Sequence, residues 1–100
     1  MVVIEFVCKA KPGHFAEVSE RYSTFAADFL SAQEELETVV IFADEAAGEV
    51  HGMGLYDSRD AAEAVSSNAQ FAEFNDAISS LLSGPPERRE YSMLHFYAKS

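Results

Sequence analysis

A tyrosine, two histidines and a cysteine are the side chains of this 100-residue chain that could do chemistry. Tyr56 closes an apolar stretch directly before Asp57 and Ser58. There a phenol could orient a phenolic substrate or take its proton. A tyrosine at the end of a strand is also commonly an amphipathic core residue whose hydroxyl reaches water. Both interpretations of Tyr56 remain open at the level of sequence.

His51 and His95 are the histidines that fall in predicted strands. Imidazole titrates near neutral pH, so either residue could be a general base, and both could converge inside a barrel if their faces agree. The alternative is a histidine that bonds a neighbour at an interface. His14 falls in a predicted first helical turn, where we expect a solvated surface position.

Cysteine content and motif spacing bear on cofactors. Cys8 is the only cysteine, so no disulfide can form within the chain, which fits a reducing compartment. On the core face of a strand its thiol is expected to be buried and inert. Three histidines without short ligand spacing predict no metal site, and no phosphate-binding glycine loop is present. We therefore expect no metal and no cofactor.

The hydrophobic period changes in the middle of Glu49–Ser66. Val50–Tyr56 alternates like a strand, with Gly52 and Gly54 on the side of Tyr56, and a helix follows at once. Two positions without side chains leave space between sheet and helix, for a small ligand or for a large core side chain. The ligand pocket predicted there is lined by Phe6, Cys8, Tyr22, Gly52, Gly54, Phe71 and Phe74.

Hydrophobic periodicity predicts the remaining elements. Alternation predicts strands over Val2–Lys9, Leu36–Ala43 and Arg89–Ala98, and Asp44–Gly48 forms a hairpin connection. Intervals of three and four predict a first helix of about 18 residues and a second helical region broken near Ser67-Asn68. The helical stripes carry Phe15, Val18, Tyr22, Phe25 and Phe29, and then Phe71, Phe74, Ile78 and Leu81.

The predicted element order is β-α-β-β-α-β, the split βαβ pattern of a ferredoxin-like α+β fold. It gives a four-stranded antiparallel sheet with the helices on one face, in one domain over residues 1–100. The opposite face would carry Val3, Val7, His51, Met53 and Leu55, a set too apolar for water. We therefore predict a homodimer that pairs these faces and closes a dimeric α/β barrel.

The charge balance excludes several classes of partner. Seventeen acidic and seven basic side chains give a net charge of -10. Such a surface repels phosphate backbones and anionic lipid headgroups, so we expect neither nucleic acid nor membrane partners. We expect no signal peptide, and no apolar run reaches about 20 residues, so a cytoplasmic location is the expectation.

Three motifs, with their order and spacing, resemble the dimeric α/β-barrel superfamily and specifically its antibiotic biosynthesis monooxygenase-like group. They are KPGH at 11–14, GLYDSRDAAEA at 54–64, and GPP with EY at 84–91. The resemblance covers essentially the whole chain. It implies a substrate site between sheet and helices in each subunit. Among the activities it implies are cofactor-independent oxygenation of aromatic compounds, haem degradation and isomerisation.

The chain departs from that group at three positions. Tyr56 stands where the group commonly has Trp, and Phe6 stands where haem-degrading members have Asn. A histidine common on the second helical region would fall near Val65–Ser66, and none is there. Haem degradation is therefore not expected.

Two functions remain. The first is a cofactor-independent monooxygenase-like or isomerase-like enzyme for a small aromatic or carbonyl compound, in which Tyr56 positions the substrate and His95 or His51 moves a proton. The second is a non-catalytic dimeric protein that binds a small apolar or aromatic ligand or acts as a scaffold. A free space of about 300 Å³ or more between sheet and helices would favour a ligand. A space filled by Phe71, Phe74 and Tyr56 would favour the scaffold.

Overall fold

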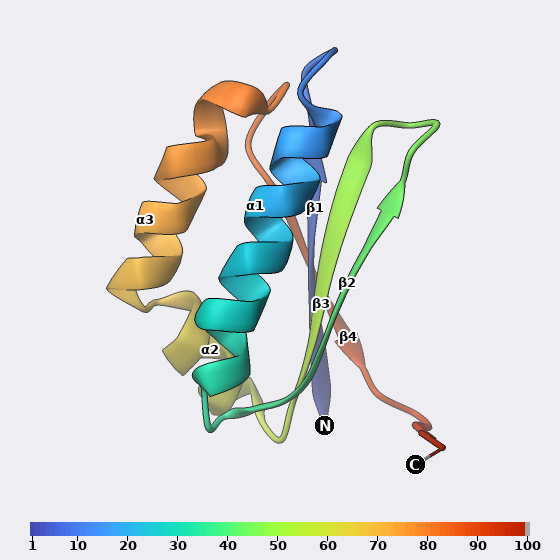
Figure 1. The fold of residues 1–100 in the computed structure, drawn as a ribbon. Helices are drawn as coiled ribbons and strands as arrows, with labels where there is room; N and C mark the ends of the chain where they lie inside the picture. The colour runs from blue at the N-terminus through green and yellow to red at the C-terminus, as the bar shows by residue number, and fades with distance from the viewer. Residues whose placement is uncertain (100) are drawn as a thin grey trace.

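The computed structural model describes residues 1–99. All strand pairs are antiparallel and form one sheet in the order β2-β3-β1-β4, with the helices on one face (Figure 1). This confirms the predicted ferredoxin-like α+β fold. The elements are β1 (Val2–Lys9), α1 (Phe15–Asp28), β2 (Leu36–Asp44), β3 (Glu49–Tyr56), α2 (Arg59–Ser66), α3 (Ala69–Ile78) and β4 (Glu87–Ser92), with 3₁₀ turns at Leu30–Ala32 and Ser79–Leu81.

Side-chain caps begin the two helices that follow β3. The Ser58 hydroxyl accepts a hydrogen bond from the Ala61 amide at 3.1 Å and so caps α2. The Asn68 side chain accepts from the Gln70 amide at 2.8 Å and so caps α3. Each bond satisfies an amide that the first helical turn leaves without an internal partner. The break between α2 and α3 therefore lies at Ser67-Asn68, as predicted.

The last strand is shorter than predicted. We expected Arg89–Ala98, but β4 ends at Ser92, which pairs with Val2 at the very start of β1. The last main-chain bond at this edge runs from the Met93 amide to the Met1 carbonyl, at 3.1 Å. The Val2–Ser92 pair is the last of the ladder between β1 and β4, and the chain beyond Ser92 leaves the sheet. We call Met93–Lys99 the C-terminal arm; Figure 1 shows it projecting from the end of β4.

The core lies between the sheet and the helices, in two clusters. The first joins β1, β3 and all three helices, and the second joins β1, β3, α1 and the end of α3. Cys8 is fully buried in the second cluster, as expected for an inert thiol. The first cluster contains Ile4, Ala26, Phe29, Leu30, Tyr56, Ala62, Val65 and Phe71, and the second Cys8, Ala10, Val18, Tyr22, Val50, Ile78 and Leu82.

The sheet face opposite the helices, called the open face below, is partly covered within the chain. Val3, Val7 and Leu55, which we expected to be uncovered, are each less than 10% exposed. Met93 and Phe96 of the C-terminal arm lie over one end of this face and help to enclose a cavity of about 220 Å³. Apolar side chains that remain exposed here are Val40 (48%), Phe42 (40%) and Tyr91 (46%).

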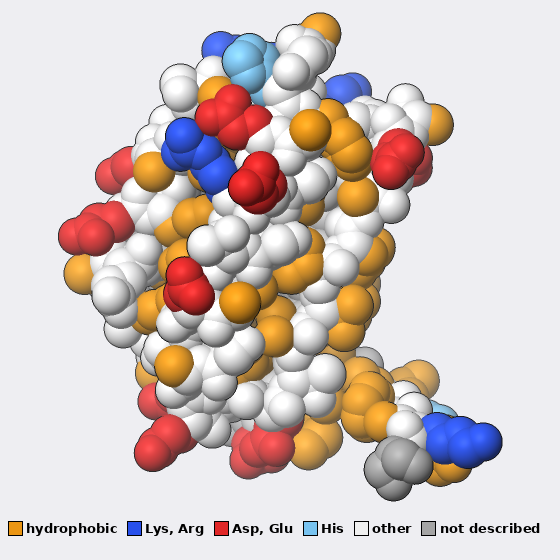
Figure 2. Space-filling model, viewed as in Figure 1, with side chains coloured by type: hydrophobic (Ala, Val, Ile, Leu, Met, Phe, Trp, Pro, Cys, Tyr) orange, Lys and Arg blue, Asp and Glu red, His pale blue; other side chains and the backbone are white. Residues whose placement is uncertain are grey.

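Apolar surface also runs along the strand side of the molecule and continues onto the C-terminal arm in Figure 2. Within residues 1–99, no helix combines the length and the apolar composition that crossing a membrane requires.

Candidate functional site

The two glycines of β3 face the helices, as predicted, but the space beside them is filled. Gly52 pairs with Phe6 of β1, and a Cβ atom at Gly52 would lie 2.7 Å from Cε1 of Tyr22. A Cβ atom at Gly54 would lie 2.8 Å from Cδ1 of Leu36 and 3.0 Å from Cε2 of Tyr56. The glycines therefore admit core side chains in this conformation. The side chains that fill the space beside Gly52 and Gly54 are those of Tyr22, Leu36 and Tyr56, and not those of Phe71 or Phe74.

Aromatic rings from β1, α1 and α3 form a continuous cluster around these glycines. Phe74 stacks on Phe25, with ring centroids 4.0 Å apart, and meets Tyr22 edge to face at 5.2 Å. Phe71 packs against Phe25 at 5.4 Å and against Phe6 at 5.2 Å. The predicted pocket residues Phe6, Tyr22, Phe71 and Phe74 are thus brought together as one packed aromatic cluster.

A groove of about 480 Å³ lies directly outside this cluster, between α1 and α3. Ile78 is fully buried and Phe25 and Phe74 are half-buried, so these three form the floor. Exposed polar and charged side chains form the rim. The rim carries Glu17, Glu20, Arg21, Thr24 and Asp28. Sequence periodicity could assign these residues to helix faces but could not show that the two helices leave a groove between them.

The two phenols inside the fold stay protonated at neutral pH. Burial raises the pKa of Tyr56 from its ordinary value of 10.0 to about 12, although the positive charge of Arg88 opposes the shift. Burial also raises the pKa of Tyr22, and the neighbouring Cys8 adds to this effect. A phenol with so high a pKa can donate a hydrogen bond but does not take a proton at neutral pH.

The structure does not bring Tyr56, His51 and His95 together. Tyr56 faces the helices, whereas His51, an odd number of residues earlier on the same strand, lies on the open face. His95 is exposed on the C-terminal arm and borders a shallow cavity with Met1 and Glu37. The sheet therefore separates Tyr56 from His51, and the end of β4 carries His95 out of the sheet.

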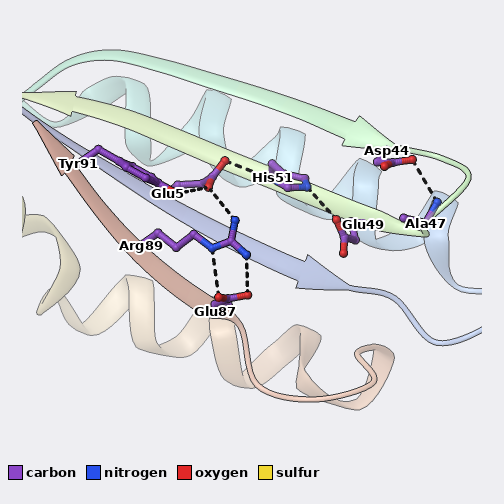
Figure 3. A network of polar contacts seen from close by, with 8 residues as sticks. All are labelled: Glu5, Asp44, Ala47, Glu49, His51, Glu87, Arg89 and Tyr91. Carbon is purple, nitrogen blue, oxygen red and sulfur yellow. Dashed lines mark hydrogen bonds and ion pairs between the residues drawn. The ribbon is translucent and has the colours of Figure 1, made fainter. Parts of the chain in front are cut away.

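His51 instead bonds neighbouring carboxylates on the open face (Figure 3). Its Nδ1 lies 3.3 Å from Glu5 Oε2, and its Nε2 lies 3.1 Å from Glu49 Oε1. Both contacts are hydrogen bonds only when the ring carries two protons, because a neutral imidazole has a single N–H donor. The ring also stacks on Phe42, with centroids 4.9 Å apart. His51 thus bonds neighbours within its own chain, and its place at an interface stays a prediction.

Glu5 is the centre of this network and was not identified as a site residue from the sequence. It is only 9% exposed, and it accepts a hydrogen bond from the Tyr91 hydroxyl at 3.4 Å. Arg89 Nη1 lies 3.8 Å from the same oxygen, Glu5 Oε1, and Arg89 itself donates two hydrogen bonds to Glu87 (Figure 3). The sequence feature that could have identified Glu5 is its position as the one carboxylate inside the apolar run VVIEFVC.

Metal binding has no geometric support in the part of the chain that the structure describes. Within residues 1–99, no three His, Cys, Asp or Glu side chains are arranged to hold an ion.

No family model and no curated protein matches the sequence. Solved structures match the fold along nearly the whole chain. A protein of unknown function from Nitrosomonas europaea aligns with a TM-score of 0.86 and 15% identity, over 99% of this chain and 94% of the other. An antibiotic biosynthesis monooxygenase gives 0.81 and 12%, over 95% and 100%. A variant of SnoaB, a cofactor-independent oxygenase from Streptomyces nogalater, gives 0.78 and 14%, over 98% and 97%.

These structures have the fold that the sequence resemblance implied. The chain has the fold of the antibiotic biosynthesis monooxygenase-like proteins. At identities this low, the likeness concerns the fold and not the activity.

Proposed function

We propose that this chain, which has the monooxygenase-like fold, is a cofactor-independent oxygenase of small aromatic compounds that works as a homodimer. The observation that carries the proposal is the groove between α1 and α3, whose aromatic floor leads to Tyr22 and Gly52. SnoaB, which shares the fold, is a cofactor-independent oxygenase, and this supports the same reaction class here.

The groove has the properties of a site for a flat ring. Its volume of about 480 Å³ falls within the usual range for small-molecule pockets. Phe25 and Phe74 offer stacking surfaces. Behind them, the hydroxyphenyl group of Tyr22 fills the space beside Gly52, and a phenolic ligand of the same shape would fit there once Tyr22 rotated away. Substrate would therefore enter from the groove and exchange with Tyr22.

The interior restricts the chemistry. Tyr22 and Tyr56 are protonated at neutral pH, and His14, His51 and His95 all lie outside the space between sheet and helices. A substrate that needs a strong base, such as the carbonyl compound of an isomerase, fits poorly. An electron-rich phenol or quinol fits better, because it can lose its proton to water before it binds and then react with dioxygen as the anion, without a base from the protein. Tyr56 would position that substrate by donating a hydrogen bond to its oxygen.

A ligand screen followed by an oxygen assay tests this function. Quinols, flavonoid-like aromatics and short aldehydes are screened for a rise in melting temperature, since a ligand that binds only the native state stabilises it. We expect aromatic compounds to raise the melting temperature and at least one of them to cause oxygen uptake without added metal or flavin. Stabilisation by aldehydes alone, or an unchanged melting temperature throughout, would rule out an aromatic oxygenase.

A non-catalytic binding or scaffold protein is the second candidate, and the filled space beside Gly52 and Gly54 favours it. A ring that already packs on these glycines removes the need for a ligand. An aromatic compound that raises the melting temperature but causes no oxygen uptake would assign the chain to this class.

The homodimer is supported by the composition of the open face. Val40, Phe42 and Tyr91 are each at least 40% exposed there, around the buried carboxylate of Glu5. A second copy laid on this face would remove these side chains from water. Sedimentation should give twice the 11.0 kDa of one chain. A single species of 11.0 kDa at micromolar concentration would refute the dimer.

A further inference from the structure

The groove between α1 and α3 is apolar at its floor and acidic at its rim. Of the charged side chains that line it, Glu17, Glu20 and Asp28 are acidic and Arg21 alone is basic. Arg21 Nη2 lies 3.1 Å from Glu17 Oε1, so these two charges offset each other. Within residues 1–99, no basic side chain forms an ion pair with Glu20 or Asp28. The rim therefore keeps an excess of negative charge.

The second helix of the groove adds no cation to this rim. α3 carries Glu73 and Asp76 and no basic residue, and the basic residue of α1 is Arg21. Figure 2 shows acidic side chains spread over the two helices, with apolar atoms exposed between them. An anionic compound that approaches the floor of the groove is thus repelled, and a cationic one is attracted.

Asp28 occupies a position that is unfavourable for the helix itself. It is the last residue of α1, where carbonyl groups without internal partners give the helix end a partial negative charge. A carboxylate is repelled there, and the last turn of α1 has no basic side chain to compensate. Departures from such local stability rules are expected at functional sites. The placement of Asp28 therefore indicates a cation supplied from outside the chain.

Asp28 is also within reach of the aromatic floor. Phe25 lies three residues earlier on α1, and side chains at this spacing are neighbours on the helix surface, with Cβ atoms about 5–6 Å apart. Phe25 stacks on Phe74, with ring centroids 4.0 Å apart, so an aromatic pair lies beside the carboxylate. On the other side of Phe25, Arg21 is already paired with Glu17. This arrangement fits an aromatic compound with a short cationic arm directed toward Asp28.

We propose that the groove takes a phenolic amine, whose ammonium group binds Asp28 at the end of α1 and whose ring lies against Phe25 and Phe74. The proposal rests on the oxygenase function proposed above and names the class of its substrate. It also agrees with the reactive form of that substrate. A phenol that reacts as the anion brings a negative charge to a protein with a net charge of -10, and an ammonium group on the same molecule cancels that charge.

Calorimetric titration with three phenols of similar size tests the substrate class. Tyramine carries the ammonium arm, para-propylphenol is its neutral counterpart, and para-hydroxyphenylacetate carries a carboxylate. We expect tyramine to bind at least tenfold more tightly than para-hydroxyphenylacetate. Tyramine should lose at least fivefold in affinity when the ionic strength rises from about 0.01 M to about 1 M, because the screening length falls from about 30 Å to about 3 Å. The affinity of para-propylphenol should not fall.

Asp28→Asn separates the effect of this carboxylate from that of the total charge. Asp28 is exposed, so the variant should fold, and it should bind tyramine at least fivefold more weakly while binding para-propylphenol as the wild type does. Asp28→Glu keeps the charge and should retain most of the affinity for tyramine. Glu73→Gln is the control, because it removes the same charge from an exposed position on α3 that does not line the groove. Its affinity for tyramine should equal that of the wild type.

Equal affinity for tyramine in Asp28→Asn and the wild type would overturn the proposal. Tighter binding of para-hydroxyphenylacetate than of tyramine would also overturn it, and would indicate that Arg21 binds the arm. In both cases a quinol or para-propylphenol that binds and causes oxygen uptake would leave the oxygenase function standing. Tyramine that binds through Asp28, with no oxygen uptake from any aromatic compound, would support the ligand class and refute the oxygenase. Failure of all aromatic compounds to bind would overturn both.

Discussion

The phenol ring of Tyr22 occupies the space that any side chain at position 52 would need. A Cβ atom on Gly52 would lie 2.7 Å from Cε1 of Tyr22 and 2.8 Å from its hydroxyl oxygen. Helix α1 and strand β3 therefore meet ring against backbone. This contact determines how the interior is filled. The ring of Tyr22 also packs edge to face against Phe74, and Phe74 lines the groove between α1 and α3, so Tyr22 connects the interior to that groove.

Gly52→Ala should destabilise the fold by about 1–3 kcal/mol, the usual cost of forcing extra volume into a packed core. The neighbouring Tyr22 is 2% exposed, so moving its ring away from position 52 gives up buried contacts unless a ligand takes its place. Urea denaturation measures the loss. Gly84→Ala is the matched control, because a Cβ atom there meets nothing within 4 Å. Equal stability of the two variants would show that Tyr22 moves freely. Tyr22→Leu should restore part of the stability lost in Gly52→Ala.

Glu5→Gln should cost about 1–3 kcal/mol, because it removes a buried charge that His51, Arg89 and Tyr91 all contact. The free energy of unfolding from urea titrations at pH 7 is the readout. Glu17→Gln provides the comparison. Its partner Arg21 lies 3.1 Å away on the exposed face of α1, where an ion pair contributes well under about 1 kcal/mol. Equal effects of the two substitutions would contradict a structural role for the Glu5 network.

Stability should fall as the pH rises above about 9, and Cys8 should cause the first part of the fall. Burial raises the pKa of the Cys8 thiol from 9.0 to about 11. Because the folded state favours the neutral thiol, this contribution is complete below pH 9 and is lost as the pH rises to about 11.

Tyr56 also lowers the stability as the pH rises, because burial raises its pKa from 10.0 to about 12 in the folded state. Urea midpoints measured from pH 8 to 11 should therefore fall less steeply in Cys8→Ala than in the wild type. Superimposable slopes would mean that Cys8 ionises as freely in the folded chain as in the unfolded one.

Tyr56→Phe should reduce turnover of any aromatic substrate found in the screen by at least tenfold while leaving the fold intact. The reason is the loss of the one hydrogen bond that Tyr56 would donate to the substrate oxygen. Oxygen uptake gives the turnover and far-UV circular dichroism checks the fold. Tyr97→Phe is the control, since Tyr97 is 77% exposed on the C-terminal arm. Unchanged turnover in Tyr56→Phe would remove Tyr56 from the site.

The sequence alone determined the element order, the helix break near Ser67-Asn68, and the side of the sheet on which Gly52, Gly54 and Tyr56 lie. These features are local. The hydrophobic period of a strand (two residues) or a helix (3.6 residues) and a helix-capping side chain can each be recognised within a few neighbouring residues. The faces of β1 follow from the same rule, so the buried position of Cys8 was predictable as well.

Only the tertiary structure decided what fills the interior and where the last strand ends. Tyr22 rather than Phe71 or Phe74 reaches Gly52, because the axial position of α1 over β3 is set by the packing of both core clusters. β4 stops at Ser92 because its partner β1 begins at Val2, and pairing register is a relation between segments about 90 residues apart in a chain of 100. The same non-local pairing placed His51 beside Glu5. Local periodicity does not encode such non-local pairing, so it could not show that His95 lies beyond the end of β4 and apart from Tyr56 and His51.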